Sequence, residues 1–414
     1  MASKISPLAP AAFPQLPPVA GVRLAAHRSG IRYKTERDET MLAVLEPGTT
    51  VAGVLTTSKT ASAPVHWCRH ALKTGSARAL VVNAGNSNAF TGAAGEAFVQ
   101  STLDATVQAI GCAPEEVYLA STGVIGQPMA QDLIARHVPA MVDKLVPAEG
   151  AAWEKAARAI MTTDTFPKGA AAFAEIDGVT VTVAGFAKGS GMIAPDMATM
   201  LGFVFTDAAI SSPVLQQLLS GITVRTFNSI TVDGDTSTSD TVIACATGKA
   251  AHSAITSIDD PRVAAFAAAL EEVCLDLAQQ IIRDGEGATK FVTIRVAGAE
   301  DDAAAKRIGM TVANSPLVKT AIAGEDANWG RIVAAVGRSG EAADRDKLVI
   351  SVGGVQICAN GMEVPGYDET PVAAHMKGLE IDIDIDLNIG PGRATVWTCD
   401  LTHGYIDING SYRS

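Results

Sequence analysis

The sequence predicts an α+β fold built from packed layers, and three observations support this. Short apolar runs bounded by turn residues are typical of strands. One long segment repeats apolar residues at spacings of three and four, which is typical of an amphipathic helix. The expected strands and helices do not alternate regularly, which favours α+β layers over a doubly wound sheet. A chain of 414 residues is long enough to bury its core without disulfides or metal.

The first part of the chain is expected to hold an extended arm followed by strands. The segment up to about Val19 is rich in proline, which favours an extended path over the surface. Strands are predicted at Met41–Leu45, Val51–Leu55 and Ala79–Val82.

A helix and a hairpin are predicted further along. Apolar spacing predicts a helix over Met129–Leu145, broken or kinked by Pro139. Ala174–Ile176 and Val179–Val183 are expected to pair, because the Asp177-Gly178 dipeptide between them is typical of a tight hairpin turn.

The clearest helix is predicted from Arg262 to Ile282. Its apolar stripe consists of Val263, Phe266, Leu270, Val273, Leu277 and Ile281. Asp260 is placed to cap this helix, Pro261 suits its first position, and Gly285 is expected to end it. Glu286 would then lie in a loop just past the helix terminus, where functional residues are often found.

A strict alternation marks a strand near the C-terminus. In Leu379–Leu387 every second residue is Leu or Ile, and the residues between them are acidic. This pattern indicates a strand with one wet face. A calcium-binding ladder is the alternative, but no glycine-rich loop accompanies the acidic residues.

Composition excludes several classes of function. The chain carries 32 Lys and Arg against 44 Asp and Glu, a net charge of −12, which argues against nucleic-acid binding. An uninterrupted apolar run of membrane-spanning length is absent, so no membrane span is expected. The 6 cysteines are scattered and no secretory signal is recognisable, so a cytoplasmic, reducing location is expected.

Several polar clusters are candidates for chemistry, and each has a plain structural alternative. Small residues precede a hydroxyl residue in the segment 188–207, which suits a sharp bend or a loop entering a buried strand. Glycines in 121–126 could expose backbone N–H groups as an oxyanion hole requires, or form an ordinary turn. The segment 83–92 could line a pocket or be a turn-rich loop, and 161–165 could be a capped helix end.

Metal and triad chemistry find no support in the residue patterns. The acidic segment 231–240 lacks the ligand run of a calcium loop, and no HExxH or GxSxG motif is present. His403, the one histidine in a polar turn-rich context, is interpreted as structural. Spacing alone indicates no Ser/His/Asp triad.

Together the clusters resemble the ornithine acetyltransferase (glutamate N-acetyltransferase) family of arginine biosynthesis. The resemblance covers almost the whole chain as ordered blocks. These blocks are 55–59, 83–92, 121–123, 161–165, 188–201, 228–238, 284–290, 324–332 and 405–414.

The resemblance implies a fold and a processing event. It implies a layered α/β/β/α sandwich of the N-terminal-nucleophile kind with a smaller C-terminal α/β domain, divided at about 1–282 and 283–414. It also implies self-cleavage between Ala198 and Thr199. This gives an α chain of residues 1–198 and a β chain of residues 199–414, and the family assembles two of each.

The resemblance also implies residue roles. Thr199 would be the nucleophile that carries acetyl from N2-acetyl-L-ornithine to L-glutamate, releasing L-ornithine and N-acetyl-L-glutamate. Thr122 and Gly123 match the oxyanion hole. The substrate-binding positions are Thr162, Lys188, Thr199, Glu286, Asn409 and Ser414. No metal or cofactor is implied; acetyl-CoA is a co-substrate in some members, and no mark in the sequence decides this.

Two other functions remain open from the sequence. A related self-processing amidase or aminopeptidase would use the same nucleophile but pass the acyl group to water. A non-catalytic amino-acid-binding protein could retain the same fold.

Overall fold

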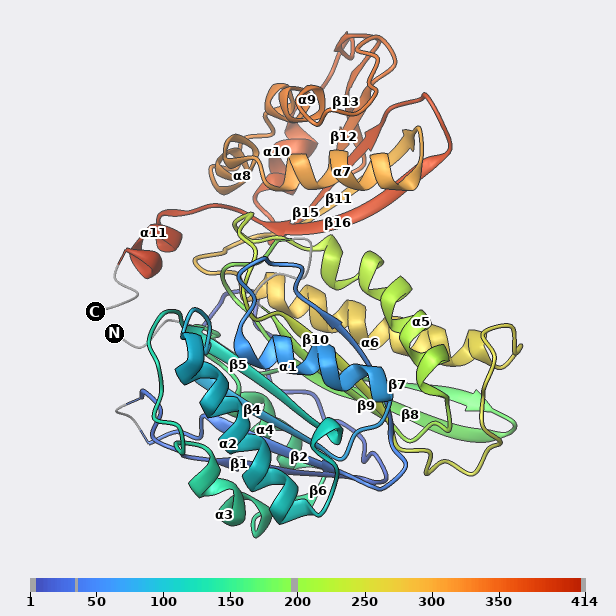
Figure 1. The fold of residues 1–414 in the computed structure, drawn as a ribbon. Helices are drawn as coiled ribbons and strands as arrows, with labels where there is room; N and C mark the ends of the chain where they lie inside the picture. The colour runs from blue at the N-terminus through green and yellow to red at the C-terminus, as the bar shows by residue number, and fades with distance from the viewer. Residues whose placement is uncertain (1–4, 34–35, 195–199, 411–414) are drawn as a thin grey trace.

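The computed structural model describes residues 5–33, 36–194 and 200–410, whose strands form three sheets (Figure 1). Sheet I contains, in order across the sheet, β5 (Val117–Val124), β4 (Ala79–Asn86), β2 (Thr40–Leu45), β1 (Val22–His27) and β6 (Val146–Pro147). Sheet II contains β3 (Thr50–Leu55), β10 (Thr241–Ala246), β9 (Leu201–Thr206), β8 (Val179–Lys188) and β7 (Lys168–Ile176).

Sheets I and II stack face to face, with helices on both outer faces (Figure 1). The outer face of sheet I is covered by α2 (Gly92–Ile110) and α3 (Val138–Val142). The outer face of sheet II is covered by α5 (Ser212–Arg225) and α6 (Val263–Arg283). Shorter helices α1 (Ala63–Ala71) and α4 (Ala151–Ala159) pack beside β5 and β1. The predicted α/β/β/α sandwich is confirmed.

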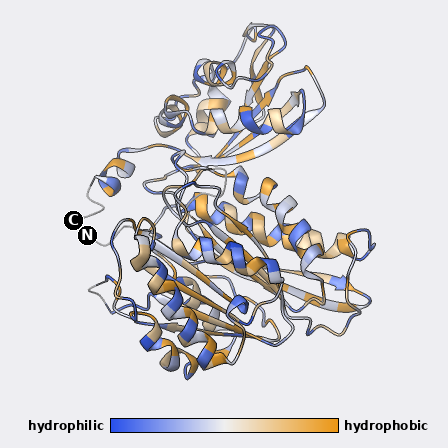
Figure 2. Cartoon of the chain, viewed as in Figure 1, coloured by the Kyte–Doolittle hydropathy of each residue, from blue (hydrophilic) through white to orange (hydrophobic). Residues whose placement is uncertain are grey.

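Alternation along each strand explains why both faces of sheet I are buried. In β4, Leu80 and Val82 point into the core shared with sheet II, whereas Ala79 and Val81 point toward α2 and α3. Figure 2 shows hydrophobic residues along the stacked strands and hydrophilic residues on the helices that cover them. A strand that is buried on both faces has a continuous run of apolar residues in its sequence.

The third sheet forms a smaller lobe with its own core. Its strands are β14 (Met362–Glu363), β13 (Val355–Ala359), β12 (Val349–Val352), β15 (Glu380–Asp386), β11 (Phe291–Ala299) and β16 (Gly392–Cys399). Its helices are α7 (Asp302–Ala313), α8 (Pro316–Ala323), α9 (Trp329–Gly337) and α10 (Thr370–Met376). The last helix, α11 (His403–Asn409), leaves this lobe (Figure 1). The division predicted at 282/283 falls in the last turn of α6, and the independence of the two parts remains a prediction.

The strongest sequence patterns agree with the structure. The predicted stripe of the long helix is buried along α6, which begins one residue after Arg262. The hairpin of β7 and β8 turns at Asp177 and Gly178, both at positive φ (55° and 75°). The alternating C-terminal segment is β15, with its isoleucines buried and its aspartates partly exposed.

The helix predicted over Met129–Leu145 is wrong. In this region the structure holds only a 3-10 turn at 135–137 followed by the short α3. Pro139 lies in the first turn of α3 rather than in a helix interior, because proline lacks the N–H that an interior position must donate.

Among the buried elements that the sequence did not predict is α2, and β4 extends beyond its predicted end. α2 is rich in Gly, Ala, Ser and Thr, which weakens its apolar stripe. β4 continues through Asn83 to Asn86, a stretch predicted to be a pocket lining or a loop, and it pairs in parallel with β5. Within the described ranges, no helix is long and apolar enough to cross a membrane.

Candidate active site

A pocket of about 230 Å3 opens where the ends of sheet I and sheet II meet. Its walls come from the ends of β5 and β8, the segment before β10, the loop after α6, and α11. Six of the sequence-predicted residues line it, namely Thr122, Gly123, Thr162, Lys188, Glu286 and Asn409. Segments almost 290 positions apart in the sequence are therefore brought to one site by the stacking of the two sheets.

The end of β5 supplies one wall. Gly123 has φ 128°, and a Cβ at this position would collide with the backbone of Gly85 on β4, so only glycine fits. The Thr122 hydroxyl is buried and has no hydrogen-bond partner among the described residues. An unpaired buried hydroxyl is costly unless something else occupies its hydrogen bond, which makes Thr122 a candidate donor to a ligand.

Lys188, the last residue of β8, supplies a buried cation. Its side chain is 2% exposed, and its Nζ donates to Thr162 Oγ1 at 3.5 Å. Burial lowers the pKa of Lys188 because it disfavours the charged form, while nearby Asp164 and Asp240 oppose that shift. A desolvated ammonium with a weak protein partner suits an anionic group of a ligand.

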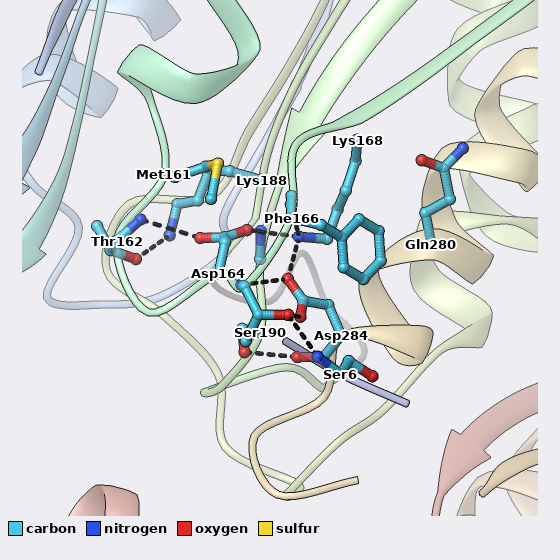
Figure 3. A network of polar contacts seen from close by, with 12 residues as sticks. Ser6, Met161, Thr162, Asp164, Phe166, Lys168, Lys188, Ser190, Gln280 and Asp284 are labelled. Atoms are coloured by element: carbon cyan, nitrogen blue, oxygen red, sulfur yellow. Dashed lines mark hydrogen bonds and ion pairs between the residues drawn. The ribbon is translucent and has the colours of Figure 1, made fainter. Parts of the chain in front are cut away.

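A buried ionic network holds this wall in place (Figure 3). Asp164 accepts from Thr162 N (3.0 Å) and Gly189 N (2.7 Å), so it fixes the backbone on both sides of the Lys188 side chain. Lys168 Nζ bridges Asp164 Oδ1 (2.7 Å) and Asp284 Oδ2 (2.6 Å). All three side chains of this ion-paired cluster are fully buried. The network therefore couples β7 and the 161–165 loop to the loop after α6.

Glu286 lies in that loop and supplies the opposite charge. Asn409 Nδ2 from α11 donates to Glu286 Oε2 at 2.7 Å, and the Glu286 backbone N–H donates to Ser190 O at 2.9 Å. A Cβ on Gly191 would strike the Glu286 carboxylate, so glycine allows this close approach. Burial raises the pKa of Glu286, and its hydrogen bonds from Asn409 and Thr163 partly offset this.

The predicted positions Ala198, Thr199 and Ser414 lie outside the described residues. The described chain resumes at Met200, whose backbone N–H donates to Asp240 Oδ1 at 3.0 Å. Leu201, the first residue of β9, pairs with Lys188 across sheet II. The chain thus enters β9 beside the buried cation of the pocket.

Several contributors were missed by sequence reasoning. Asp164 was noticed only as part of a capped helix end, whereas α4 ends at Ala159 and the bond from Thr162 N to Asp164 lies in the loop that follows. Asp240 ends a segment considered only as a cation loop, although its carboxylate is fully buried. An acidic residue directly before an apolar strand was the available signal for Asp240. In the part of the chain that the structure describes, no group of three His, Cys, Asp or Glu side chains could hold a metal ion.

Comparisons with known proteins cover nearly the whole chain. The ArgJ family model matches residues 23–414. A Gluconobacter oxydans protein named arginine biosynthesis bifunctional protein ArgJ is 56% identical over 410 residues, 99% of this chain and 96% of that protein. An Agrobacterium fabrum protein of the same name is 54% identical over 417 residues, 100% of both chains.

A solved structure agrees with these sequence matches. The crystal structure of an arginine biosynthesis bifunctional protein ArgJ from Bacillus halodurans is 44% identical, with a TM-score of 0.50. It covers 52% of this chain and 100% of its own. With a family model spanning residues 23–414 and relatives more than 50% identical over their full length, this chain belongs to the ArgJ family.

Proposed function

We propose that this chain transfers acetyl from N2-acetyl-L-ornithine to L-glutamate in a ping-pong cycle through an acetylated Thr199. The products are L-ornithine and N-acetyl-L-glutamate. The observation that carries the proposal is the convergence of Thr122, Gly123, Lys188 and Glu286 on one pocket. Membership of a family whose relatives are named for arginine biosynthesis supports the pathway.

The nucleophile would arise by self-cleavage between Ala198 and Thr199. The Thr199 hydroxyl attacks the Ala198 carbonyl, and water hydrolyses the resulting ester. The α-amine set free on Thr199 titrates near roughly 7.7–8.0 when unperturbed, so it can accept the hydroxyl proton without a histidine. The entry of the chain into β9 beside Lys188 supports this assignment, because Thr199 is covalently joined to Met200.

The charges and donors of the pocket suit an N-acetylated amino acid. Lys188 would bind a carboxylate, Glu286 an ammonium group, and Thr162 and Asn409 would orient the substrate. Thr122 and Gly123 would stabilise the oxyanion of the tetrahedral intermediate. Ser414, the last residue, is assigned to the same site by family resemblance.

The proposal also covers a second acetyl donor, the absence of a cofactor, the assembly of the chains and their location. Acetyl-CoA would be a second acetyl donor, and the word bifunctional in the relatives' name supports a second activity. No metal or other cofactor is needed, because the base and the nucleophile come from one residue. Two α and two β chains would assemble in the cytoplasm.

Two measurements test the proposal. Denaturing mass spectrometry should find two species that sum to the 42.6 kDa chain plus one water, split before Thr199. Thr199→Ala should remain a single chain with no acetyl transfer, and a cut, active variant would refute the mechanism. Incubation with N2-acetylornithine alone separates transfer from hydrolysis: rapid acetate release without glutamate would favour an amidase instead.

A further inference from the structure

The N-terminal arm, residues 5–19, is a packed segment that the proposed mechanism does not use. The ArgJ family model begins at residue 23, so the arm lies outside that match. Leu8 is buried in the core that α6 and β7 share. Farther along the arm, the Trp153 indole N–H donates to Pro17 O at 3.1 Å. The arm is therefore fixed to the larger lobe at both of its ends.

Ser6, near the start of this arm, makes hydrogen bonds to two loops that contribute to the pocket. Its backbone N–H donates to Thr165 Oγ1 at 3.0 Å, and its hydroxyl donates to Arg283 O at 2.6 Å. The last carbonyl groups of a helix have no partner within the helix, and Arg283 is the final residue of α6, so Ser6 satisfies one of these groups. Ser6 therefore joins the 161–165 loop to the loop after α6 (Figure 3).

These contacts close a ring of hydrogen bonds. The Thr165 hydroxyl, which accepts from Ser6, donates in turn to the Asp284 carboxylate, and Thr165 N donates to Asp284 Oδ2 at 2.9 Å. Asp284 directly follows Arg283, whose carbonyl accepts from Ser6. Hydrogen bonds that follow one another in this way strengthen each other. The ring therefore resists separation of the two loops.

The ring lies at the base of the residues that these loops present to the pocket. Thr162 comes three residues before Thr165, Glu286 comes two residues after Asp284, and both Thr162 and Glu286 line the pocket. Ser190 extends the same constraint, because its hydroxyl donates to Asp284 O at 2.6 Å and its carbonyl accepts from Glu286 N at 2.9 Å. A change in the ring would therefore change the separation of Thr162 and Glu286.

We infer that Ser6 is a positioning residue for acetyl transfer, which holds the two loops at the separation that the substrate requires. This inference rests on the proposed function, because that function gives Thr162 and Glu286 their substrate-binding roles. Ser6 is not one of the residues that line the pocket, so it acts through Thr165 and the end of α6.

Two substitutions at Ser6 test the role of its hydroxyl. Ser6→Ala removes the hydrogen bond to Arg283 O and keeps the backbone N–H that binds Thr165. The KM for N2-acetylornithine should rise about threefold to tenfold, the range expected when one hydrogen bond is lost. The kcat should change by less than about twofold, since the loops hold substrate and transition state alike. Ser6→Thr keeps a hydroxyl and should restore the KM to within about twofold of the natural value.

A matched control lies at the opposite end of sheet II. The Ser212 hydroxyl donates to Val51 O at 2.7 Å, and this bond is part-buried, as is the bond from Ser6 to Arg283. Val51 lies near the start of β3, and the pocket lies toward the end of that strand, where Leu55 pairs with Thr241. Ser212→Ala therefore loses a comparable hydrogen bond far from the pocket and should leave the KM unchanged.

Hydrogen exchange followed by mass spectrometry gives a readout that needs no activity. In Ser6→Ala, peptides covering 161–168 and 283–290 should exchange faster, on the order of threefold to tenfold, because both loops would open more often. The amides of Thr165 and Glu286 belong to these peptides and are hydrogen-bonded in the folded chain. Ser212→Ala should not change exchange in either peptide.

Three results would count against these ideas in different ways. Unchanged exchange or an unchanged KM in Ser6→Ala would overturn the inference, because the ion pairs of Lys168 with Asp164 and Asp284 would then hold the loops without the arm. An equal rise of the KM in Ser212→Ala would also overturn it, since loss of any such bond would then be enough. If the natural chain transfers no acetyl group, the proposed function fails instead, and the exchange rates alone decide whether Ser6 holds the loops.

Discussion

Glu286 and Lys188 are oppositely charged side chains that line one pocket and are both buried. Glu286 is 8% exposed and Lys188 is 2% exposed. Burial raises the pKa of Glu286 and lowers the pKa of Lys188, so it favours the neutral form of each side chain. Such a pair is costly in the empty site and is best stabilised by a ligand with both charges. Under the proposed function, these charges would serve binding at the expense of stability.

Glu286→Gln tests this cost. Its carbonyl can still accept from Asn409, but the charge is lost, so the KM for N2-acetylornithine should rise on the order of 10- to 100-fold. The raised pKa of Glu286 means that ionisation destabilises the folded state as the pH rises through that pKa. The variant should therefore have a higher melting temperature than the natural chain at pH 8. This difference in melting temperature should vanish below about pH 4. A lower melting temperature at pH 8 would contradict this account.

At the scale of elements, the buried network of Asp164, Lys168 and Asp284 joins β7 to the two loops that carry Thr162 and Glu286. Burial by itself would raise the pKa of Asp164, but the Lys168 and Lys188 ammonium groups outweigh it and hold that pKa at about 2. Lys168 therefore pairs with two buried carboxyl groups, although burial still raises the pKa of Asp284.

Lys168→Met should leave Asp164 and Asp284 without their shared cation and lower the free energy of unfolding by about 3–5 kcal/mol. Urea unfolding at neutral pH measures the loss. The low pKa of Asp164 adds a pH test, since its stabilisation is present above about pH 4 and is lost as the pH falls toward 2. The loss of unfolding free energy caused by Lys168→Met should therefore become smaller as the pH falls through that range.

A surface pair provides the control for Lys168→Met. Arg225 and Glu271 are paired at 2.7 Å, with Arg225 59% exposed. Exposed pairs contribute about 0–1 kcal/mol, so Arg225→Met should be nearly neutral. Equal losses in the two variants would show that burial of the network is unimportant.

At the scale of the whole molecule, sheet II would tie the two products of self-cleavage together. β9 and β10 follow the proposed cleavage site, yet they lie between β3 on one side and β8 and β7 on the other, all of which precede it. β9 pairs with β8 from Lys188 to Val183, and β10 pairs with β3 along its full length. The two proposed fragments would share one core and could not part without unfolding it.

The cut protein should therefore stay in one piece under native conditions and come apart only in denaturant. Native mass spectrometry should find both fragments in each particle, whereas denaturing conditions should release them separately. Both fragments contribute strands to the larger lobe, so this lobe should unfold in urea in one cooperative transition. Dissociation of the fragments before loss of β-sheet signal would contradict this arrangement.

The amino-acid sequence was enough to predict the family, the strongly periodic elements and six of the residues that line the pocket. The stripe of α6, the Asp177-Gly178 turn and the alternation of β15 were predicted because each depends on residues close together in the chain. The roles of Thr122, Lys188 and Glu286 came from resemblance, and the structure brings these residues to one pocket.

Elements and side-chain partners that depend on distant contacts became apparent in the folded chain alone. Asn83 to Asn86 is polar, yet it forms part of a buried strand because β5 and neighbouring side chains satisfy its hydrogen bonds. The 129–145 segment forms a 3-10 turn and the short α3 rather than one long helix, with Pro139 in the first turn of α3. Asp240 meets Met200, and Lys168 meets Asp284, across separations that no local pattern encodes. The physical reason is that burial and charge pairing are properties of the packed chain.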